Sequence, residues 1–177
     1  MIDGRQALRR QKSGAFTIVE LMIMISIAGI LVILVIPRID DIGQINAGIA
    51  VDKVLADLRY AKRFAINHNC RSRVAYDSAG DTYAVSEDSS GSFQTAEDPT
   101  TRGNFIVDLN AGIWSGVGIG PVSFDGQSTV EFDSTGAPYS VSAGAPSPLS
   151  SDGSVEVGSN APLIRVGAGS GRIYVET

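Results

Sequence analysis

One unbroken apolar segment near the N-terminus limits what this chain can fold into more than any other feature. Residues 16–36 make up 21 positions, of which 17 are apolar and none is basic. An α-helix rises 1.5 Å per residue, so the segment would be about 30 Å long, the thickness of the hydrocarbon core of a bilayer. The sequence therefore predicts a membrane-spanning helix over residues 16–36, followed by one further domain.

Charge is divided unevenly between the two sides of this segment. Residues 1–15 have a balance of +3; the formal charge of the whole chain is −5, which leaves −8 for the remainder. Because a basic flank is retained in the cytoplasm, we expect a cytoplasmic N-terminus, a single membrane pass and an exported C-terminal domain. In a cell with two membranes, the pass would be through the inner membrane and the domain would be periplasmic. An acidic exported domain is not attracted to phosphates, so nucleic acid is not an expected partner.

The apolar segment differs from an ordinary secretory signal. Such signals have an apolar core of about 7–15 residues, followed by small residues at the cleavage site. Here the core is longer and is followed by Pro37 and Arg38, whereas the small residues Gly14 and Ala15 precede it. Cleavage after the segment is therefore not expected.

The junction before the segment reads Gly14-Ala15-Phe16-Thr17-Ile18-Val19-Glu20-Leu21. It resembles the class III signal of type IV pilins and type II secretion pseudopilins. The resemblance implies that residues 1–15 are a cytoplasmic leader, that a prepilin peptidase cleaves between Ala15 and Phe16, and that Phe16 is then methylated. The family usually has Gly before the cut, where this chain has Ala15. Cleavage after Gly14 is the alternative.

The resemblance also assigns assembly residues. Counted from Phe16, Glu20 is fifth, Gly29 fourteenth and Pro37 twenty-second, positions where pilins commonly carry these residue types. By resemblance, the segment from Gly29 to Pro37 can lose helical order when the filament packs. The alternative is that both residues are simply tolerated, as they are in many membrane helices.

Glu20 places a carboxyl group in an apolar helix, which costs about 2.5–3.5 kcal/mol at mid-membrane and less near the surface. The resemblance implies that the amino group of Phe16 on a neighbouring subunit offsets this cost and aligns the two subunits. The alternative is a glutamate that reaches the lipid headgroups. The implied partners are other pilins or pseudopilins through helix packing, the prepilin peptidase, an inner-membrane assembly platform and membrane lipid.

An amphipathic pattern continues beyond Pro37. Steps of three and four residues form one apolar stripe, which consists of Ile39, Ile42, Ile45, Ile49, Val51, Val54, Leu55, Leu58, Ala61 and Ala65. We therefore expect one continuous helix over residues 16–67, with a transmembrane half at 16–36. Its amphipathic half, within 37–70, would pack against the exported domain.

From residue 71 the apolar period changes from 3.6 to 2, which indicates strands. The alternating runs, separated by turn signals, are Val74/Tyr76, Tyr83/Val85, Phe105/Val107/Leu109, Val130/Phe132, Tyr139/Val141, Val155/Val157, Ile164/Val166 and Ile173/Val175. Segments 86–103 and 142–162, rich in polar residues or glycine, are expected to be loosely ordered. The predicted fold class is α+β: a long N-terminal helix packed on an antiparallel β domain over 71–177, pilin-like and with two sheets.

Later stretches indicate which kind of pilin this is. Residues 54–69, 130–136 and 171–175 resemble the minor pseudopilin H and FimT group; generic helix and strand–turn patterns are the alternative. The resemblance implies a minor pseudopilin, a structural subunit of the type II secretion pseudopilus that helps to export folded proteins. The alternative is a minor type IV pilin of the FimT or FimU kind, in pilus biogenesis, adhesion or DNA uptake. Some of those bind DNA through a Gly-Arg-x-Arg element, and the matching stretch Gly171-Arg172-Ile173-Tyr174 lacks the second Arg.

We expect no enzymatic activity, no cofactor and no metal. His68 and Cys70 are the only residues of their kinds, too few for a four-ligand zinc site or a Ser-His-Asp triad. The acidic residues between 77 and 98 match no calcium loop and are interpreted as solvated surface. Trp114 is interpreted as a loop aromatic at the edge of the core. The remaining basic cluster is interpreted as a solvated face or a contact with a partner subunit: Arg59, Lys62, Arg63, Arg71 and Arg73.

Overall fold

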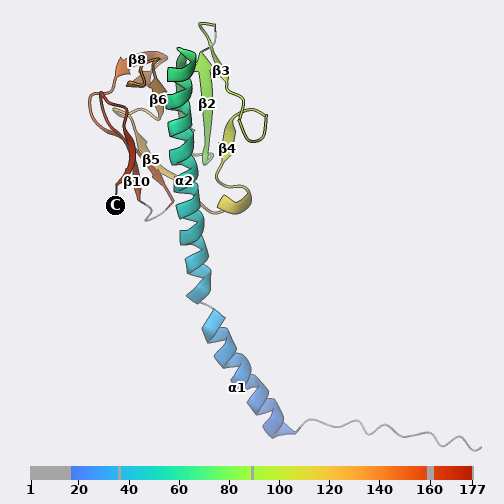
Figure 1. Cartoon of the computed structure of the whole chain (residues 1–177). Coiled ribbons are helices and arrows are strands. Elements are labelled where there is room, and N and C mark those ends of the chain that lie inside the picture. Colours follow the sequence, from blue (N-terminus) through green and yellow to red (C-terminus); the bar gives the residue numbers. More distant parts are fainter. Residues whose placement is uncertain (1–16, 36, 89, 159–161, 177) are drawn as a thin grey trace, which may run out of the picture. The chain divides into compact units, whose positions relative to one another are not determined.

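The computed structural model describes residues 17–35, 37–88, 90–158 and 162–176 (Figure 1). It divides the chain into two units, Met1–Ile39 and Asp40–Thr177. The helix expected over 16–67 is described as α1 (Ile18–Val35) and α2 (Pro37–His68), and Ile36 between them lies outside the described residues. Pro37 lacks a backbone N–H, so it fits the first position of a helix better than an interior one.

The apolar segment of the sequence is longer than the helix described within it. Phe16 and Ile36, its two ends, lie outside the described residues, and Thr17 precedes α1. Among the residues that the structure describes, no helix has both the length and the apolar character needed to cross a membrane.

The second unit contains two antiparallel sheets. The larger has the order β3-β2-β1-β6-β7-β8, with β4 also paired to β2, and the smaller has the order β11-β10-β9-β5. The expected α+β class with antiparallel sheets is confirmed. The strands are β1 (Arg71–Asp77), β2 (Thr82–Asp88), β3 (Phe93–Thr95), β4 (Ile106–Asp108), β5 (Ile119–Ser123), β6 (Thr129–Phe132), β7 (Pro138–Ser142), β8 (Ala145–Pro148), β9 (Gly153–Val157), β10 (Leu163–Val166) and β11 (Ile173–Glu176).

All eight expected alternating runs coincide with a strand or overlap one. The expectation of loose order was wrong for parts of both segments: 86–103 contains the end of β2 and all of β3, and 142–162 contains β8 and β9. β8 includes Pro146 and Pro148, which an edge strand tolerates because its outward N–H groups need no partner.

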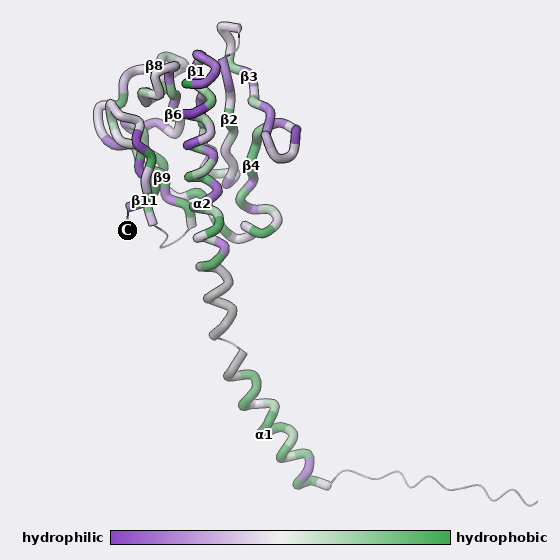
Figure 2. The backbone as a smooth tube through the Cα atoms, in the orientation of Figure 1, coloured by the Kyte–Doolittle hydropathy of each residue, from purple (hydrophilic) through white to green (hydrophobic). Residues whose placement is uncertain are grey.

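α2 packs on the strands through a single face. Its buried apolar residues share one core with both sheets and are Ala47, Ala50, Val51, Val54, Leu58, Ala61 and Ala65. The expected burial of the stripe was wrong for Ile45 and Ile49, which are 61% and 42% exposed, whereas the side chains of Ile39 and Ile42 lie outside the description. The buried face at this end of the helix is instead formed by Ala47, Ala50 and Val51. Figure 2 shows the resulting mixture of polar and apolar residues along α2, in contrast to the largely apolar α1.

α2 ends in a capping motif that turns the chain into β1. Asn69 adopts a left-handed conformation with φ of 51°. The N–H of Cys70 donates to the carbonyl of Ala65, and the N–H of Asn69 donates to that of Ile66, the pattern of a Schellman cap. Ser72 then donates a 2.7 Å hydrogen bond from its hydroxyl to the carbonyl of Ala61. The helix end is thereby fastened to the first strand.

Candidate functional site

The predicted processing site lies outside the described residues, since Ala15 and Phe16 are both beyond the start of the described chain. The next residues form the start of α1. Thr17 is its N-cap: the Thr17 Oγ1 accepts a 3.2 Å hydrogen bond from the N–H of Glu20. Thr17 and Glu20 have the spacing of a capping box, in which the threonine satisfies one of the free amides of the first turn.

The cap places Glu20, the first predicted assembly residue, in the first turn of α1 with its side chain exposed. The first turn of a helix favours a carboxylate, because the amide dipoles leave a partial positive charge there. Glu20 therefore has a local electrostatic reason for its position in addition to any contact with another subunit. The pattern Thr17-x-x-Glu20 is visible in the sequence and marks the start of a helix, one residue later than the start predicted at Phe16.

α1 exposes apolar side chains on all sides. Its large apolar residues from Ile18 to Val32 are exposed, from 52% for Met24 to 80% for Ile18. A helix that is apolar around its whole circumference is stable only when lipid or protein covers it. Gly29, the second predicted assembly residue, has no atom within 4 Å of where a Cβ would lie. Its small size is therefore not required by any contact among the described residues.

Pro37, the third predicted assembly residue, begins α2. The boundary between the two units follows shortly after it, at Ile39 and Asp40. The three predicted assembly residues thus lie at the start of α1, within α1 and at the start of α2.

The expected basic cluster on α2 is mostly an internal anchor. The Arg59 guanidinium donates to the carbonyl of Ile173 at 3.2 Å. The Lys62 ammonium donates to the carbonyls of Ser170 and Gly171 at 3.0 and 2.9 Å. Lys62 therefore holds the β10–β11 connection against the helix, and Arg59 holds the start of β11. Arg59 is nevertheless exposed and Lys62 half-buried, so both also face solvent.

The basic residues of β1 also form their contacts within the domain. Glu131 on β6 is 1% exposed and accepts from Arg71 Nη1 at 3.2 Å and from Arg73 Nη2 at 2.8 Å. Arg71 also pairs with Asp88 at 2.7 Å, and Arg73 stacks 3.8 Å from the centre of the Phe93 ring. These pairs join β1, β2, β3 and β6.

In the stretch Gly171-Arg172-Ile173-Tyr174, the glycine is required by packing. Gly171 has φ of +59°, and a Cβ there would overlap the carbonyl oxygen of Gly136 and lie 3.1 Å from Lys62 Nζ. Arg172, the basic residue of the stretch, lies with its guanidinium 5.4 Å from the centre of the Tyr174 ring. The glycine is therefore explained by its positive φ and by close approach of this turn to the backbone of Gly136.

Several of the acidic residues between 77 and 98 each accept a hydrogen bond within the fold. Asp81 accepts from the N–H of Ile119 at 2.8 Å, and Asp98, 9% exposed, accepts from Thr100 and Thr101 within its own loop. Solvated surface was wrong for Asp98. In the described part of the chain, no three His, Cys, Asp or Glu side chains are grouped as metal ligands would be.

Trp114 closes the short helix η1 (Gly112–Trp114) and packs partly buried against the core, as expected. Its indole Nε1 is buried with no hydrogen-bond partner among the described residues.

His68 stacks on Phe64, with ring centres 4.0 Å apart, and its Nδ1 lies 3.1 Å from the carbonyl oxygen of Phe64.

Comparisons of the chain with protein-family models, with curated proteins and with solved structures found no match. A proposal of function therefore depends on the motif of residues 14–21 and on the contacts described above.

Proposed function

We propose that this chain is a subunit of a pilin-like filament, inserted in the inner membrane before assembly, and that it is a minor pseudopilin of a type II secretion pseudopilus. The observation that carries the proposal is α1: a capped helix, apolar and exposed all round, with one carboxylate in its first turn. This helix precedes a unit that has its own buried core.

The exposed apolar surface of α1 has to be shielded from water by lipid or by protein. A filament subunit would be in contact with each of these in turn. Lipid would enclose the apolar segment 16–36 before assembly, and the helices of neighbouring subunits would enclose it in the filament. In the second unit, Ile45 and Ile49 on α2 are also exposed and would be available for packing against neighbouring subunits.

Glu20 gives such packing a register. Its place in the first turn keeps its carboxylate within about one turn of the mature N-terminus implied by the resemblance, at Phe16. In an apolar environment, an amino group on the next subunit would be its strongest available partner. Pairing these groups would set the axial step between subunits.

The second unit would be the part exposed in the periplasm. This unit is held together by hydrogen bonds, ion pairs and apolar contacts, because the one cysteine of the chain cannot form an internal disulfide. The assembly partners would be other pseudopilins, with the prepilin peptidase and the inner-membrane platform acting on the chain beforehand.

Processing tests this proposal directly. The full-length chain would be produced in cells with an active or an inactive prepilin peptidase, and its intact mass measured. We expect the loss of residues 1–15 and the addition of one methyl group at Phe16, only when the peptidase is active. Ala15→Gly is the matched control and should still be cut, whereas Ala15→Leu should not. An unchanged mass with the active peptidase would refute the proposal.

A further inference from the structure

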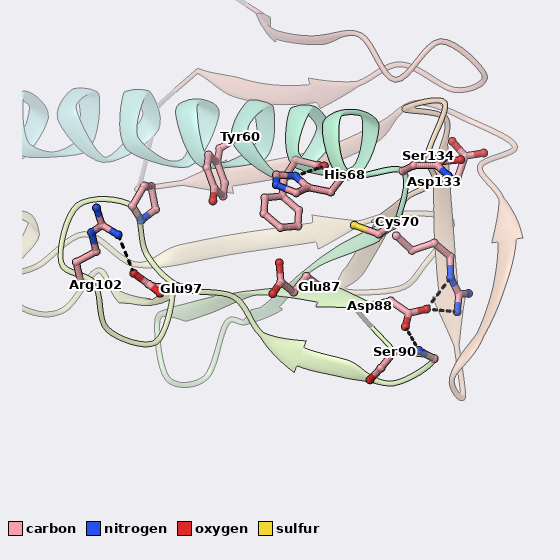
Figure 3. Close-up of a pocket in the computed structure, with 15 residues that line it drawn as sticks. Tyr60, His68, Cys70, Glu87, Asp88, Ser90, Glu97, Arg102, Asp133 and Ser134 are labelled. Carbon is pink, nitrogen blue, oxygen red and sulfur yellow. Dashed lines mark hydrogen bonds and ion pairs between the residues drawn. The ribbon is translucent and has the colours of Figure 1, made fainter.

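A groove of about 1050 Å³ lies beside the C-terminal part of α2. Its walls come from α2, from the end of β2 and from the loop that follows β3 (Figure 3). Small-molecule pockets usually measure about 300–1,000 Å³ and enclose their ligand. This groove is at the upper limit, and its rim residues His68, Glu97 and Arg102 are exposed. Its size and exposure fit a segment of polypeptide better than a small ligand.

Aromatic side chains form the α2 wall of the groove. Tyr60, Phe64 and His68 follow one another at intervals of four residues, so they lie on one face of the helix. The ring centres of Tyr60 and Phe64 are 5.9 Å apart, and those of Phe64 and His68 are 4.0 Å apart and stacked. None of the three is fully buried. The electron-rich faces of such rings attract cations.

A carboxylate faces this wall from β2. Tyr83 and Val85 point into the core from β2 and are buried, and the alternation of the strand puts Glu87 on the same side. Figure 3 shows the Glu87 side chain directed toward α2. An acid therefore occupies a position where the pattern of the strand calls for an apolar residue.

Glu87 also differs from the other acids of the groove. Asp88 pairs with Arg71 at 2.7 Å and Glu97 pairs with Arg102 at 3.3 Å. Asp133 accepts hydrogen bonds from Thr135 and Ala137 within its own turn. Among the described residues Glu87 forms no ion pair. Burial and, next, the charge of Glu87 raise the pKa of the Tyr60 hydroxyl and of the Cys70 thiol, in agreement with the position of Glu87 in the groove beside both side chains.

We propose that the groove binds a segment of a partner protein that carries lysine or arginine, with one basic side chain lying between the aromatic wall and Glu87. The lining contains four carboxylates against two guanidinium groups, which gives it the complementary charge. Cation–π contact and the carboxylate then act on the same group. The proposal requires nothing of α1, so it stands independently of the filament function.

Cys70 provides a built-in reporter, because it lines the groove and is the only cysteine of the chain. The rate at which an uncharged maleimide modifies Cys70 would be measured on the full-length protein in detergent. The probes would be a peptide of four arginines spaced by glycine, its glutamate counterpart and spermidine. We expect only the arginine peptide to slow modification substantially.

Variants locate the binding. Glu87→Gln should weaken protection by the arginine peptide about fivefold, the size expected for the loss of one partly exposed ion pair. Glu156→Gln, on β9 of the smaller sheet, should leave protection unchanged. Phe64→Leu keeps an apolar side chain but removes the ring, and should weaken protection about threefold. Because Glu87 itself affects the thiol, each variant is compared with and without peptide, and circular dichroism checks its fold.

Three results would overturn the proposal. The glutamate peptide could protect Cys70 as well as the arginine peptide does. Glu87→Gln could leave protection at the level of Glu156→Gln. Spermidine could protect as strongly at the same concentration, which would make the groove a site for small cations rather than for a protein segment.

Discussion

The hydroxyl group of Tyr83 on β2 donates a 2.6 Å hydrogen bond to Oδ2 of Asp57 on α2. Asp57 is 6% exposed and also accepts a 2.8 Å bond from Lys53. The buried contacts of this helix face are otherwise mainly apolar, and Ser72 is bonded to the carbonyl of Ala61. Moving α2 by one turn would take the carboxylate away from the Tyr83 hydroxyl, whereas Lys53, on the same helix, would move with it. Losing a donor to a buried carboxylate is costly, so this contact favours the observed register of α2 on the larger sheet.

Tyr83→Phe should destabilise the protein by about 1.5–3 kcal/mol, the range for a hydrogen bond to a charged group. The substitution removes only the hydroxyl and leaves Asp57 with one fewer donor. Urea unfolding of the two proteins at neutral pH measures the difference.

Tyr76→Phe is the matched control. Tyr76 is also buried, its ring centre lies 5.5 Å from that of Tyr83, and its hydroxyl has no partner among the described residues. Removing an unsatisfied hydroxyl should leave stability unchanged or raise it slightly. Equal losses for the two variants would show that the Asp57 bond contributes nothing specific.

Asp57 should also make stability depend on pH. Burial raises the pKa of Asp57 above its ordinary value of 3.8, although Lys53 and Tyr83 oppose the shift. A carboxyl group with a raised folded pKa binds its proton more tightly in the folded state, so its contribution is fully present below pH 3.8 and is lost as the pH rises through the folded pKa.

The comparison with Asp57→Asn isolates this effect. Asp88, Asp98, Asp125 and Asp133 have lowered pKa values and cause the opposite pH dependence, but both proteins contain them. The unfolding free energy of the wild type minus that of the variant should therefore fall as the pH rises from about 3.5 to 6. A difference that rises over this range would contradict the raised pKa.

Local patterns in the sequence predicted much of the fold. The alternations at Val74/Tyr76 and Tyr83/Val85 are strands β1 and β2, and the helix expected to end near Asn67 ends at His68. These elements depend on periods of 2 and 3.6, which a single stretch of sequence contains. Three strands show no such period and were missed: β3, with three residues, β5, which contains Gly120 and Pro121, and β8, with two prolines.

Long-range partners could not be predicted. Lys62 meets the carbonyls of a turn more than 100 residues away, and Glu131 is buried only because Arg71 and Arg73 cover it. The sequence around Lys62 or Glu131 contains no pattern that identifies these distant partners. The groove beside α2 was missed for the same reason, since Glu87 was interpreted as one of several surface acids.

Gly171→Ala should destabilise the protein by clearly more than Gly169→Ala. Both glycines have positive φ, at +59° and +71°, so each substitution costs about 1–2 kcal/mol in backbone conformation. Only at Gly171 would the new Cβ also overlap a carbonyl oxygen, that of Gly136. Thermal unfolding compares the two, and equal shifts in Tm would contradict the close approach.

Two substitutions in the first turn of α1 should separate the local and the intersubunit roles of Glu20. Glu20→Gln keeps the capping box, which accepts either residue at this position, but removes the charge. Thr17→Ala removes the cap bond at a cost of about 1 kcal/mol and keeps the charge.

If the charge aligns subunits, Glu20→Gln should lose most of its co-assembly into filaments, while Thr17→Ala keeps it. Crosslinking of full-length subunits in cells, compared with total membrane-extracted protein, measures this. The reverse order would mean that Glu20 matters only as part of the helix cap, because the variant that keeps the carboxylate would then be the defective one.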